Sequence, residues 1–306
     1  MKNLWLPNSA NMLQLTTSQI QFFTDHGYLT LDALADVEEV QEIRTTLERL
    51  FRERAGENEG AYGDLIAGKG QLTEENSPQI LNPAYYAPRL LKTKYFRNAL
   101  AVARQILGDE ARFFLDLSIL KKPSIGKATP WHQDGAYRDP RFDYKEVTIW
   151  LALQDVCVEN GCMNFIPGSH KRPVLEHRSV NDDSTSQALQ CVQPFDSSVA
   201  IACPLPTGGC TIHDPGILHY AGPNISDAPR FAYIMVFGAS PKLRREKRVF
   251  KWLERGGTAN QMRKRRWMLR GGIFITAWRR LRRGDLDWQS TVYWAKRSIR
   301  VLRRGS

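Results

Sequence analysis

The segment Trp131-His132-Gln133-Asp134-Gly135 constrains this chain more than any other feature. A histidine and an aspartate two positions apart on a β-strand point to the same face, because strand side chains alternate, so both can reach one metal ion. Further along the chain, His219 supplies a second imidazole. Two histidines and one carboxylate on one face are the ligands typical of non-haem Fe(II) with open coordination positions. The sequence therefore predicts an iron site built from His132, Asp134 and His219.

Two other histidines compete with His219 for the third ligand position. His213 lies six residues before His219, and His170 ends a Pro-Gly-Ser-His sequence in which Gly and Ser favour a turn. The spacing of eleven residues from His219 to Arg230, with Asn224 between them, favours His219. We expect His213 to pack or to hydrogen-bond nearby, and His170 to have a structural role.

Arg230 is the candidate for binding an anion. It precedes residues 231–237, which are apolar at odd and even positions alike, so this strand is predicted to be buried on both faces. A buried cation needs a partner, and the planar guanidinium group matches a carboxylate bidentately. An arginine that faces solvent is the alternative interpretation. If its strand follows that of His219 in an antiparallel sheet, Arg230 lies close to the metal site.

At these positions the chain resembles the phytanoyl-CoA dioxygenase family of iron- and 2-oxoglutarate-dependent oxygenases, from about Thr16 to Gly238. The landmarks, in order, are His26-Gly27-Tyr28, Lys122-Pro123, His132-Gln133-Asp134, Trp150-Leu151-Ala152-Leu153, Glu159-Asn160-Gly161-Cys162, Ile166-Pro167-Gly168-Ser169-His170-Lys171, and His219 with Asn224 and Arg230. A histidine and an aspartate two positions apart occur by chance in many chains, whereas these landmarks in one order are specific.

The resemblance implies an enzyme that uses Fe(II), O2 and 2-oxoglutarate, and that hydroxylates an unactivated carbon while 2-oxoglutarate is decarboxylated to succinate. The residues it implies are His132, Asp134 and His219 for the metal, Arg230 for the distal carboxylate of 2-oxoglutarate, and Gln133 and Trp150 as lining of the co-substrate pocket. Related halogenases have a small residue at the position of Asp134, so the carboxylate favours hydroxylation. The family usually has serine where this chain has Ala221, which changes the expected contacts of the co-substrate.

Hydrophobic patterning predicts a mainly β fold with flanking helices. A first helix begins at Thr16 or Thr17 and ends at Gly27, and a second begins at Asp36, with Glu39 completing a capping box. The apolar stripe predicted for the second helix is Val37, Val40, Ile43, Leu47, Leu50 and Phe51. From residue 113 on, short strand-like runs separated by Gly and Pro predict a double-stranded β-helix, or jelly roll, of antiparallel strands. These runs are 113–119, 147–153, 163–166, 199–202, 210–213 and 231–237.

Two polar segments interrupt this pattern. Residues 55–87 are rich in Gly, Asn, Pro and acids, and are predicted to be a loop that borders the mouth of the site. Residues 178–198 lack periodicity, and are predicted to be a mobile surface loop or lid. Tyr137 and Arg138, which follow the ligand pair, are candidates for facing the substrate.

The net charge of +11 is concentrated at the C-terminus. Residues 242–306 contain 21 Lys and Arg against four acids, a net charge of +17, which leaves −6 for residues 1–241. Five of the eight tryptophans also lie after residue 241. This change in composition predicts a dioxygenase domain at 1–241 and a basic, helical C-terminal tail at 242–306.

The tail predicts contact with an anionic surface. In residues 290–302 apolar and basic positions recur at helical spacing, as in a helix that lies in a membrane interface, and residues 273–278 add an apolar patch. A lipid or lipid-linked substrate presented at the membrane is then a candidate beside a soluble small molecule. Binding to nucleic acid is a less favoured alternative, as is a non-catalytic binding module that keeps the fold.

Composition also bears on the compartment. Five scattered cysteines have neither the spacing of a disulfide framework nor that of a zinc site, which indicates a reducing environment. The apolar segment within residues 1–7 is too short for a secretory signal, and a proline ends it. We therefore expect a cytoplasmic protein, with possible attachment to the inner face of the membrane through the tail.

Overall fold

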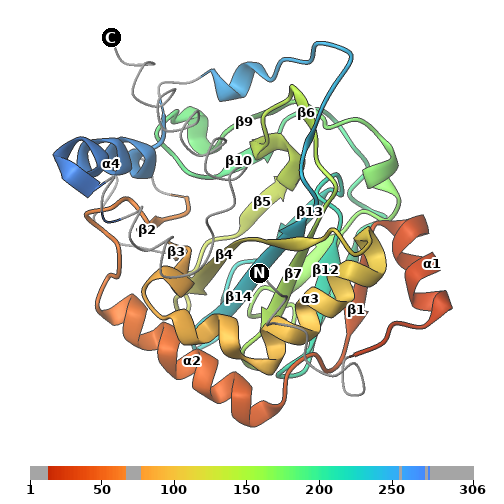
Figure 1. The fold of residues 1–306 in the computed structure, drawn as a ribbon, viewed down its shortest axis with the longest axis horizontal. Coiled ribbons are helices and arrows are strands. Elements are labelled where there is room, and N and C mark those ends of the chain that lie inside the picture. The colour runs from red at the N-terminus through yellow and green to blue at the C-terminus, as the bar shows by residue number, and fades with distance from the viewer. Residues whose placement is uncertain (1–12, 67–76, 255–256, 273–274, 276–306) are drawn as a thin grey trace, which may run out of the picture.

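The computed structural model describes residues 13–66, 77–254, 257–272 and 275, and within them the fold is mainly β with flanking helices, as predicted (Figure 1). The larger sheet has the order β1-β12-β7-β14-β4-β3-β2, and the smaller has the order β11-β8-β13-β5. The strands of the larger sheet are β1 (Tyr28–Leu31), β2 (Tyr62–Asp64), β3 (Pro78–Leu81), β4 (Arg112–Lys121), β7 (Glu146–Ala152), β12 (Cys210–His213) and β14 (Arg230–Gly238). Those of the smaller sheet are β5 (Thr129–His132), β8 (Met163–Phe165), β11 (Ile201–Cys203) and β13 (His219–Ala221).

Two further strand pairs and the helices surround these sheets. The pairs are β9 (His177–Ser179) with β10 (Leu189–Cys191), and β6 (Phe142–Asp143) with β15 (Lys242–Leu243). The α-helices are α1 (Thr17–His26), α2 (Val37–Arg52), α3 (Lys94–Leu107) and α4 (Ala259–Trp267). The short helical turns are η2 (Pro83–Tyr85), η3 (Pro88–Lys92), η4 (Asp134–Tyr137), η5 (Ser169–Lys171), η6 (Val180–Asp182), η7 (Lys251–Leu253) and η8 (Met268–Gly272).

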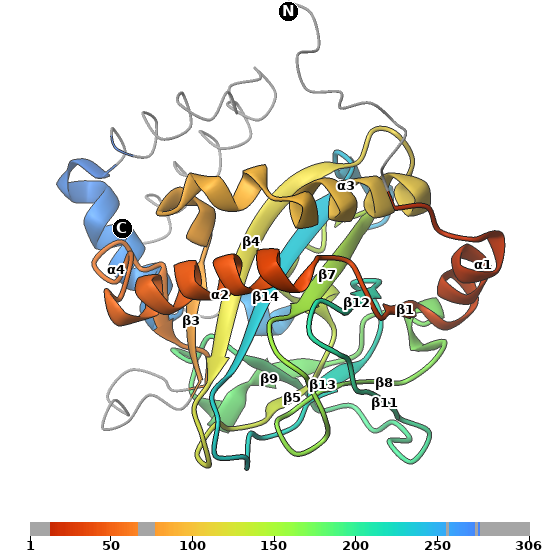
Figure 2. The ribbon, with the colours of Figure 1, turned by 90° about the horizontal axis from the view of Figure 1, so that it is seen from below.

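The larger sheet separates two apolar layers. Helices α2 and α3 cover its outer face, and the smaller sheet lies on the other side (Figure 2). Along β14, Tyr233 and Met235 pack in the outer layer, while Ala232 and Ile234 pack in the inner layer between the sheets. All nine residues of β14 are buried, which confirms the prediction for this strand. A polar side chain that points into the inner layer is therefore removed from water on both sides of the sheet.

The first predicted helix is confirmed, whereas the capping box predicted for the second is wrong. The side chain of Thr16 caps α1, and Gly27 ends it in the left-handed conformation with φ of 82°. Asp36 precedes α2 without a capping hydrogen bond from its side chain, and its carboxylate pairs with Lys94 instead. The Glu39 carboxylate instead accepts hydrogen bonds from the backbone N–H groups of Lys94 and Tyr95 at the start of α3. One helix thus caps another.

Three further local predictions need correction. Val37 is 61% exposed and does not belong to the buried stripe of α2, whose other predicted members are buried. Residues 55–87 are not simply a loop, because they include β2 and β3, which extend the larger sheet. Residues 178–198 contain most of the β9–β10 hairpin, in which Leu189 is fully buried.

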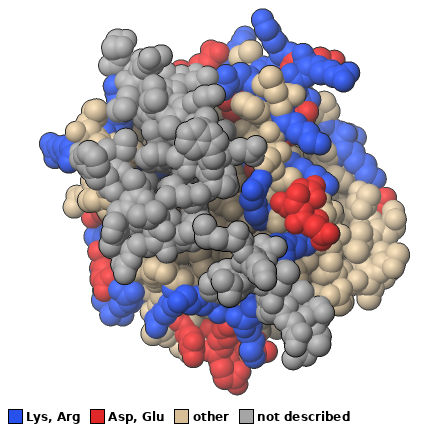
Figure 3. All heavy atoms as spheres, in the orientation of Figure 1, with Lys and Arg blue, Asp and Glu red and all other residues tan. Residues whose placement is uncertain are grey.

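The chain after β14 continues along the β-sheet domain. Strand β15 pairs with β6, and in α4 the guanidinium of Arg263 donates to the backbone carbonyl of Tyr62 in β2. Figure 3 shows Lys and Arg side chains gathered at the upper edge of the molecule, where the segment after β14 passes in Figure 1. No helix in the described part of the chain is long and apolar enough to cross a membrane. The helix predicted at 290–302 lies outside the described residues, as does the apolar patch at 273–278 except residue 275.

The contact between α2 and α3 gives a test of the fold. Replacing Glu39 by alanine removes the acceptor for two N–H groups at the start of α3, so we expect the free energy of unfolding to fall by about 1–2 kcal/mol. Glu38→Ala, at the exposed neighbouring position, is the matched control and should change it by less than about 0.5 kcal/mol. Urea denaturation measures both. Equal effects of the two substitutions would contradict the capping role of Glu39.

Candidate metal centre

His132 and Asp134 lie at the point where β5 ends and η4 begins. His132 is the last residue of β5, and Asp134 is the first of η4, so the prediction that both stand on one strand is wrong for Asp134. The chain turns there into η4, which also contains Gly135 and Ala136. Gln133 between them keeps an extended conformation, with φ of −122° and ψ of 131°. The alternation of side chains therefore continues to Asp134, and its carboxylate faces the same side as His132.

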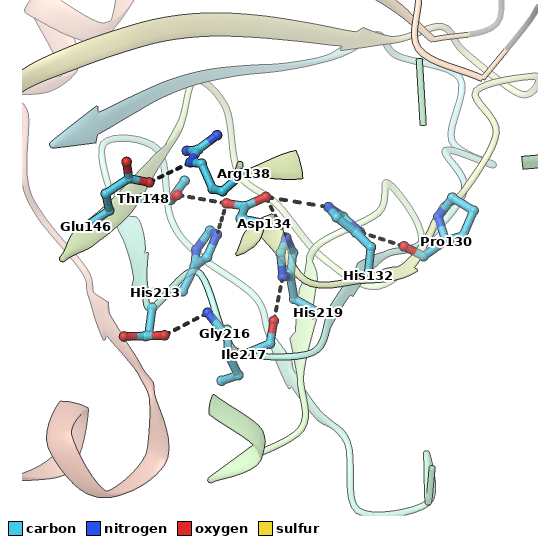
Figure 4. A network of polar contacts seen from close by, with 11 residues as sticks. Pro130, His132, Asp134, Arg138, Glu146, Thr148, His213, Gly216, Ile217 and His219 are labelled. Atoms are coloured by element: carbon cyan, nitrogen blue, oxygen red, sulfur yellow. Dashed lines mark hydrogen bonds and ion pairs between the residues drawn. The ribbon is translucent and has the colours of Figure 1, made fainter. Parts of the chain in front are cut away.

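The third predicted ligand is brought to the same place by sheet pairing. His219 begins β13 and lies opposite His132 in the antiparallel register of β13 with β5. One ligand atom from each of His132, Asp134 and His219 lies within 4.8 Å of the other two. The Asp134 Oδ1 atom is 3.7 Å from Nε2 of His132 and 3.8 Å from Nε2 of His219 (Figure 4). The described residues thus contain a cluster of two imidazoles and one carboxylate, as the sequence predicted.

The other ring nitrogen of each histidine is held by the backbone. Nδ1 of His132 lies 2.7 Å from the carbonyl oxygen of Pro130, and Nδ1 of His219 lies 3.0 Å from that of Ile217. A carbonyl oxygen only accepts, so Nδ1 carries the hydrogen and the Nε2 lone pair is free for a metal. Burial lowers the pKa of both histidines, which keeps them neutral, as metal ligands must be.

The second carboxylate oxygen of Asp134 is fixed from the larger sheet. The hydroxyl of Thr148 donates to Oδ2 at 2.8 Å, and Nε2 of His213 lies 3.4 Å from the same atom. Thr148 and His213 are register partners on β7 and β12. Burial by itself raises the pKa of Asp134, but the contact with His213 and the neighbouring histidines hold it well below its usual value. The carboxylate is therefore ionised, with Oδ1 turned toward the two histidines.

Arg230 is a buried cation near this cluster. It begins β14 and is 1% exposed, and burial lowers its pKa to about 10, so the guanidinium still carries its charge at neutral pH. Its Nε donates to the carbonyl of Asn160 at 3.4 Å, and the ring of Trp150 lies 5.3 Å from its guanidinium carbon. Nη1 has no hydrogen-bond partner among the described residues. A buried donor without a partner indicates a place for a ligand, and the charge indicates an anion.

Gln133 lies on the opposite side of the chain from the two ligands beside it. Its amide nitrogen donates to the carbonyl of Gly216, and its amide oxygen accepts from the backbone N–H of Leu175. The side chain thus joins two loops next to the site. Its role in the co-substrate pocket stays a prediction.

Other residues that the sequence singled out lie as follows. His170 contacts the carbonyl of Thr24 in α1, in agreement with the structural role expected for it. The Tyr137 hydroxyl accepts from the backbone N–H of Leu189, and the guanidinium of Arg138 donates to Glu146 at 2.7 Å. Arg138 is therefore part of an ion pair beside Asp134, in which Glu146 is the buried partner (Figure 4).

Two residues near the site were not anticipated. Lys121 is fully buried opposite Arg230 in the pairing of β4 with β14. Trp252, in the basic segment after β14, donates from Nε1 to the carbonyl of Ala136 in η4 at 2.9 Å, and its ring packs against His177. Lys121 could have been noticed in the sequence, because it ends an apolar run, whereas no local sequence pattern relates Trp252 to η4.

The hydrogen bond from Thr148 to Asp134 makes a test of the metal centre. Thr148→Val removes the hydroxyl at nearly constant volume and leaves Oδ2 with the contact from His213 alone, so we expect the affinity for Fe(II) or Co(II) to fall by roughly tenfold. The control is Thr211→Val, because Thr211 is also buried, on the adjacent strand β12, and its hydroxyl has no hydrogen-bond partner among the described residues. Anaerobic metal titration measures both, and an equal loss in the two variants would contradict the role of Thr148.

Comparison with known proteins gives consistent matches. The family model described as "Phytanoyl-CoA dioxygenase (PhyH)" matches residues 23–232. "Phytanoyl-CoA dioxygenase 1" of Oryza sativa subsp. japonica is 25% identical over 250 residues, which cover 71% of this chain and 87% of the relative. "Phytanoyl-CoA dioxygenase domain-containing protein 1" of Danio rerio is 22% identical over 257 residues, which cover 72% and 88%.

Solved structures show the same fold. EvdO2 from Micromonospora carbonacea var. aurantiaca, complexed with 2-oxoglutarate, aligns with a TM-score of 0.69 and 32% identity, over 79% of this chain and 98% of that chain. The non-heme alpha ketoglutarate dependent carbocyclase SnoK from nogalamycin biosynthesis aligns with a TM-score of 0.58 and 21% identity, over 75% and 87%. The second likeness concerns the fold alone.

Proposed function

Because the chain belongs to the phytanoyl-CoA dioxygenase family, we propose that it hydroxylates an unactivated carbon of a small-molecule substrate. As a 2-oxoglutarate-dependent dioxygenase it uses Fe(II), 2-oxoglutarate and O2. In this proposal His132, Asp134 and His219 bind the iron. The observation that carries the proposal is the convergence of these three ligand atoms within 4.8 Å. A dioxygenase that is associated with nucleic acid remains the alternative.

The residues fit the metal in chemistry as well as in position. Two neutral imidazoles with free Nε2 atoms and one ionised carboxylate form the facial ligand set of non-haem Fe(II). Bound there with 2-oxoglutarate and O2, iron supplies the oxidising power for attack on a C–H bond, and succinate and carbon dioxide are released. Thr148 and His213 keep Oδ1 of Asp134 aimed at the histidines. A side-chain carboxylate in this position supports hydroxylation rather than halide transfer.

Arg230 is proposed to bind the distal carboxylate of 2-oxoglutarate. Its unpartnered Nη1 and its charge suit a carboxylate, and Trp150 supports the guanidinium from one side. The two sheets that face each other across the inner apolar layer support the interpretation of the domain as a double-stranded β-helix. The site would then lie inside the barrel, where the surrounding apolar side chains exclude water from the reacting atoms.

The enzyme is tested by decarboxylation of 2-oxoglutarate. Protein reconstituted anaerobically with Fe(II) and then given oxygen should form succinate slowly in the absence of substrate, because 2-oxoglutarate-dependent enzymes turn over partly uncoupled. His132→Ala should abolish iron-dependent succinate formation by removing a ligand. Arg230→Ala should raise the apparent KM for 2-oxoglutarate by at least about tenfold, by removing a charge-assisted contact.

A second histidine provides the control for this assay. His170→Ala alters a residue that contacts α1, so succinate formation should match that of the unchanged protein. Fe(II) affinity is measured in parallel, so that the metal centre is tested even if a protein forms no succinate. Equal Fe(II) affinity of the unchanged protein and His132→Ala would contradict the proposed metal centre.

We further propose that the basic C-terminal segment attaches the enzyme to an anionic membrane surface, where a lipid or lipid-linked substrate is presented. The support is the excess of 21 Lys and Arg over four acids in residues 242–306, because each basic residue near an anionic leaflet contributes about 1 kcal/mol to binding. Exposed Lys242, Arg245, Lys247 and Lys251 belong to the described part of this segment. This proposal agrees with a cytoplasmic protein at the inner face of the membrane.

Vesicle binding tests the membrane proposal. We expect the full chain to co-sediment with vesicles that contain anionic lipid but not with neutral vesicles, and deletion of residues 273–306 to weaken binding by at least about tenfold. Unchanged binding after the deletion would contradict the proposal. Salt-dependent retention on DNA without binding to anionic vesicles would favour the nucleic-acid alternative.

A further inference from the structure

A buried lysine lies beside Arg230. Lys121 is the last residue of β4 and is 0% exposed. It is the register partner of Arg230 in the antiparallel pair of β4 with β14. Register partners project from the same face of a sheet, so both side chains enter the space between the two sheets. The lysine therefore enters the same buried space as Arg230.

The ammonium group of Lys121 is fixed but not saturated. Nζ donates to the backbone carbonyl of Ala221 at 2.9 Å and to that of Gly222. An ammonium group has three N–H donors, so one remains for a ligand. Ala221 and Gly222 themselves bring no side-chain donor to this place, so the ammonium group of Lys121 supplies one.

The backbone around Lys121 is also held rigidly. Its carbonyl accepts from Nδ2 of Asn224 at 3.1 Å. Gly126 packs so closely that an added Cβ would lie 2.8 Å from Cβ of Lys121, and it forms a β-bridge with Asn224. The head group is thus positioned by contacts at both ends of the side chain, which is expected of a residue that binds a ligand and not of a lysine that extends to solvent.

The charges of Lys121 and Arg230 do not balance. Burial and the nearby charge of Arg230 lower the pKa of Lys121 well below its usual value. Within the described part of the chain, the charged or ionisable groups that act on Lys121 are Arg230 and Cys162, and the one that acts on Arg230 is Cys162, so no carboxylate is among them. Holding both side chains charged in this buried place without an acidic partner is costly, and an anionic ligand between them removes most of that cost.

We propose that Lys121 is the second cation of the co-substrate pocket, and that with Arg230 it selects 2-oxo acids that carry a distal carboxylate. This inference rests on the proposed function of the site. A carboxylate has two oxygens, so Arg230 and the free N–H of Lys121 can each serve one of them. The alternative is that Lys121 only ties β4 to the Ala221–Gly222 backbone, in which case it influences all co-substrates alike.

Two co-substrates that differ only at the distal end separate these roles. 2-Oxopentanoate has the same chain length as 2-oxoglutarate, with a methyl group in place of the distal carboxylate. The readout is the visible charge-transfer band that a 2-oxo acid gives when it chelates Fe(II), titrated without oxygen. In Lys121→Gln, which retains a donor for the carbonyls but has no charge, we expect the Kd of 2-oxoglutarate to rise by about tenfold to a hundredfold. The Kd of 2-oxopentanoate should change by less than about twofold.

Two further variants complete the comparison. Lys121→Arg keeps the charge and should retain the preference for 2-oxoglutarate, which also covers the case in which Lys121→Gln does not fold. Lys127→Met removes an exposed lysine six residues away and should change neither Kd. Equal weakening of both acids in Lys121→Gln would assign Lys121 a structural role and overturn the inference, as would no change in either. Absence of the band in the unchanged protein would instead overturn the proposed function itself.

Discussion

The site depends on the antiparallel register of β13 with β5, which sets His219 opposite His132. A shift of one residue would turn His219 to the other face of the smaller sheet, because strand side chains alternate. The register is supported from the other edge of β13, where His219 is the partner of Phe165, a fully buried member of the inner apolar layer. The packing of that layer therefore determines the geometry of the imidazoles. Asp134 joins them from the adjoining turn, where Thr148 and His213 of the larger sheet hold its second carboxylate oxygen.

Charge is separated within this buried space. At one end the ionised Asp134 lies beside the neutral His132 and His219. At the other end Arg230 and Lys121 lie without a carboxylate among the groups that act on them in the described residues. Both ends are removed from water, so the charged groups at each end lose solvation free energy on folding. A metal cation at the first end and an anion at the second each restore the balance. Both ligands are then expected to raise the free energy of unfolding, because they bind the native state.

The sequence predicted the parts of the site that follow from local rules. The alternation of side chains identified His132 and Asp134, and it remained valid past the end of β5 because Gln133 stays extended. Contacts that depend on distant segments could not be predicted in this way. Glu39 fits a capping box by spacing, yet it caps α3, because the packing of the two helices brings unpaired N–H groups to it. Lys121 could be noticed at the end of an apolar run, but its relation to Arg230 arises from the register of β4 with β14, which only the assembled sheet defines.

The basic segment after β14 is connected to the ligand turn. Trp252 donates to the carbonyl of Ala136, and its ring packs against His177, whose Nε2 accepts from the backbone N–H of Gln133. The backbone on either side of Asp134 is thus held by groups outside the two main sheets. If this segment binds a surface, a change in the position of Trp252 reaches Asp134 through one hydrogen bond and two residues of backbone. The part of the segment around Trp252 therefore supports the metal centre, so its effect on activity need not pass through membrane attachment.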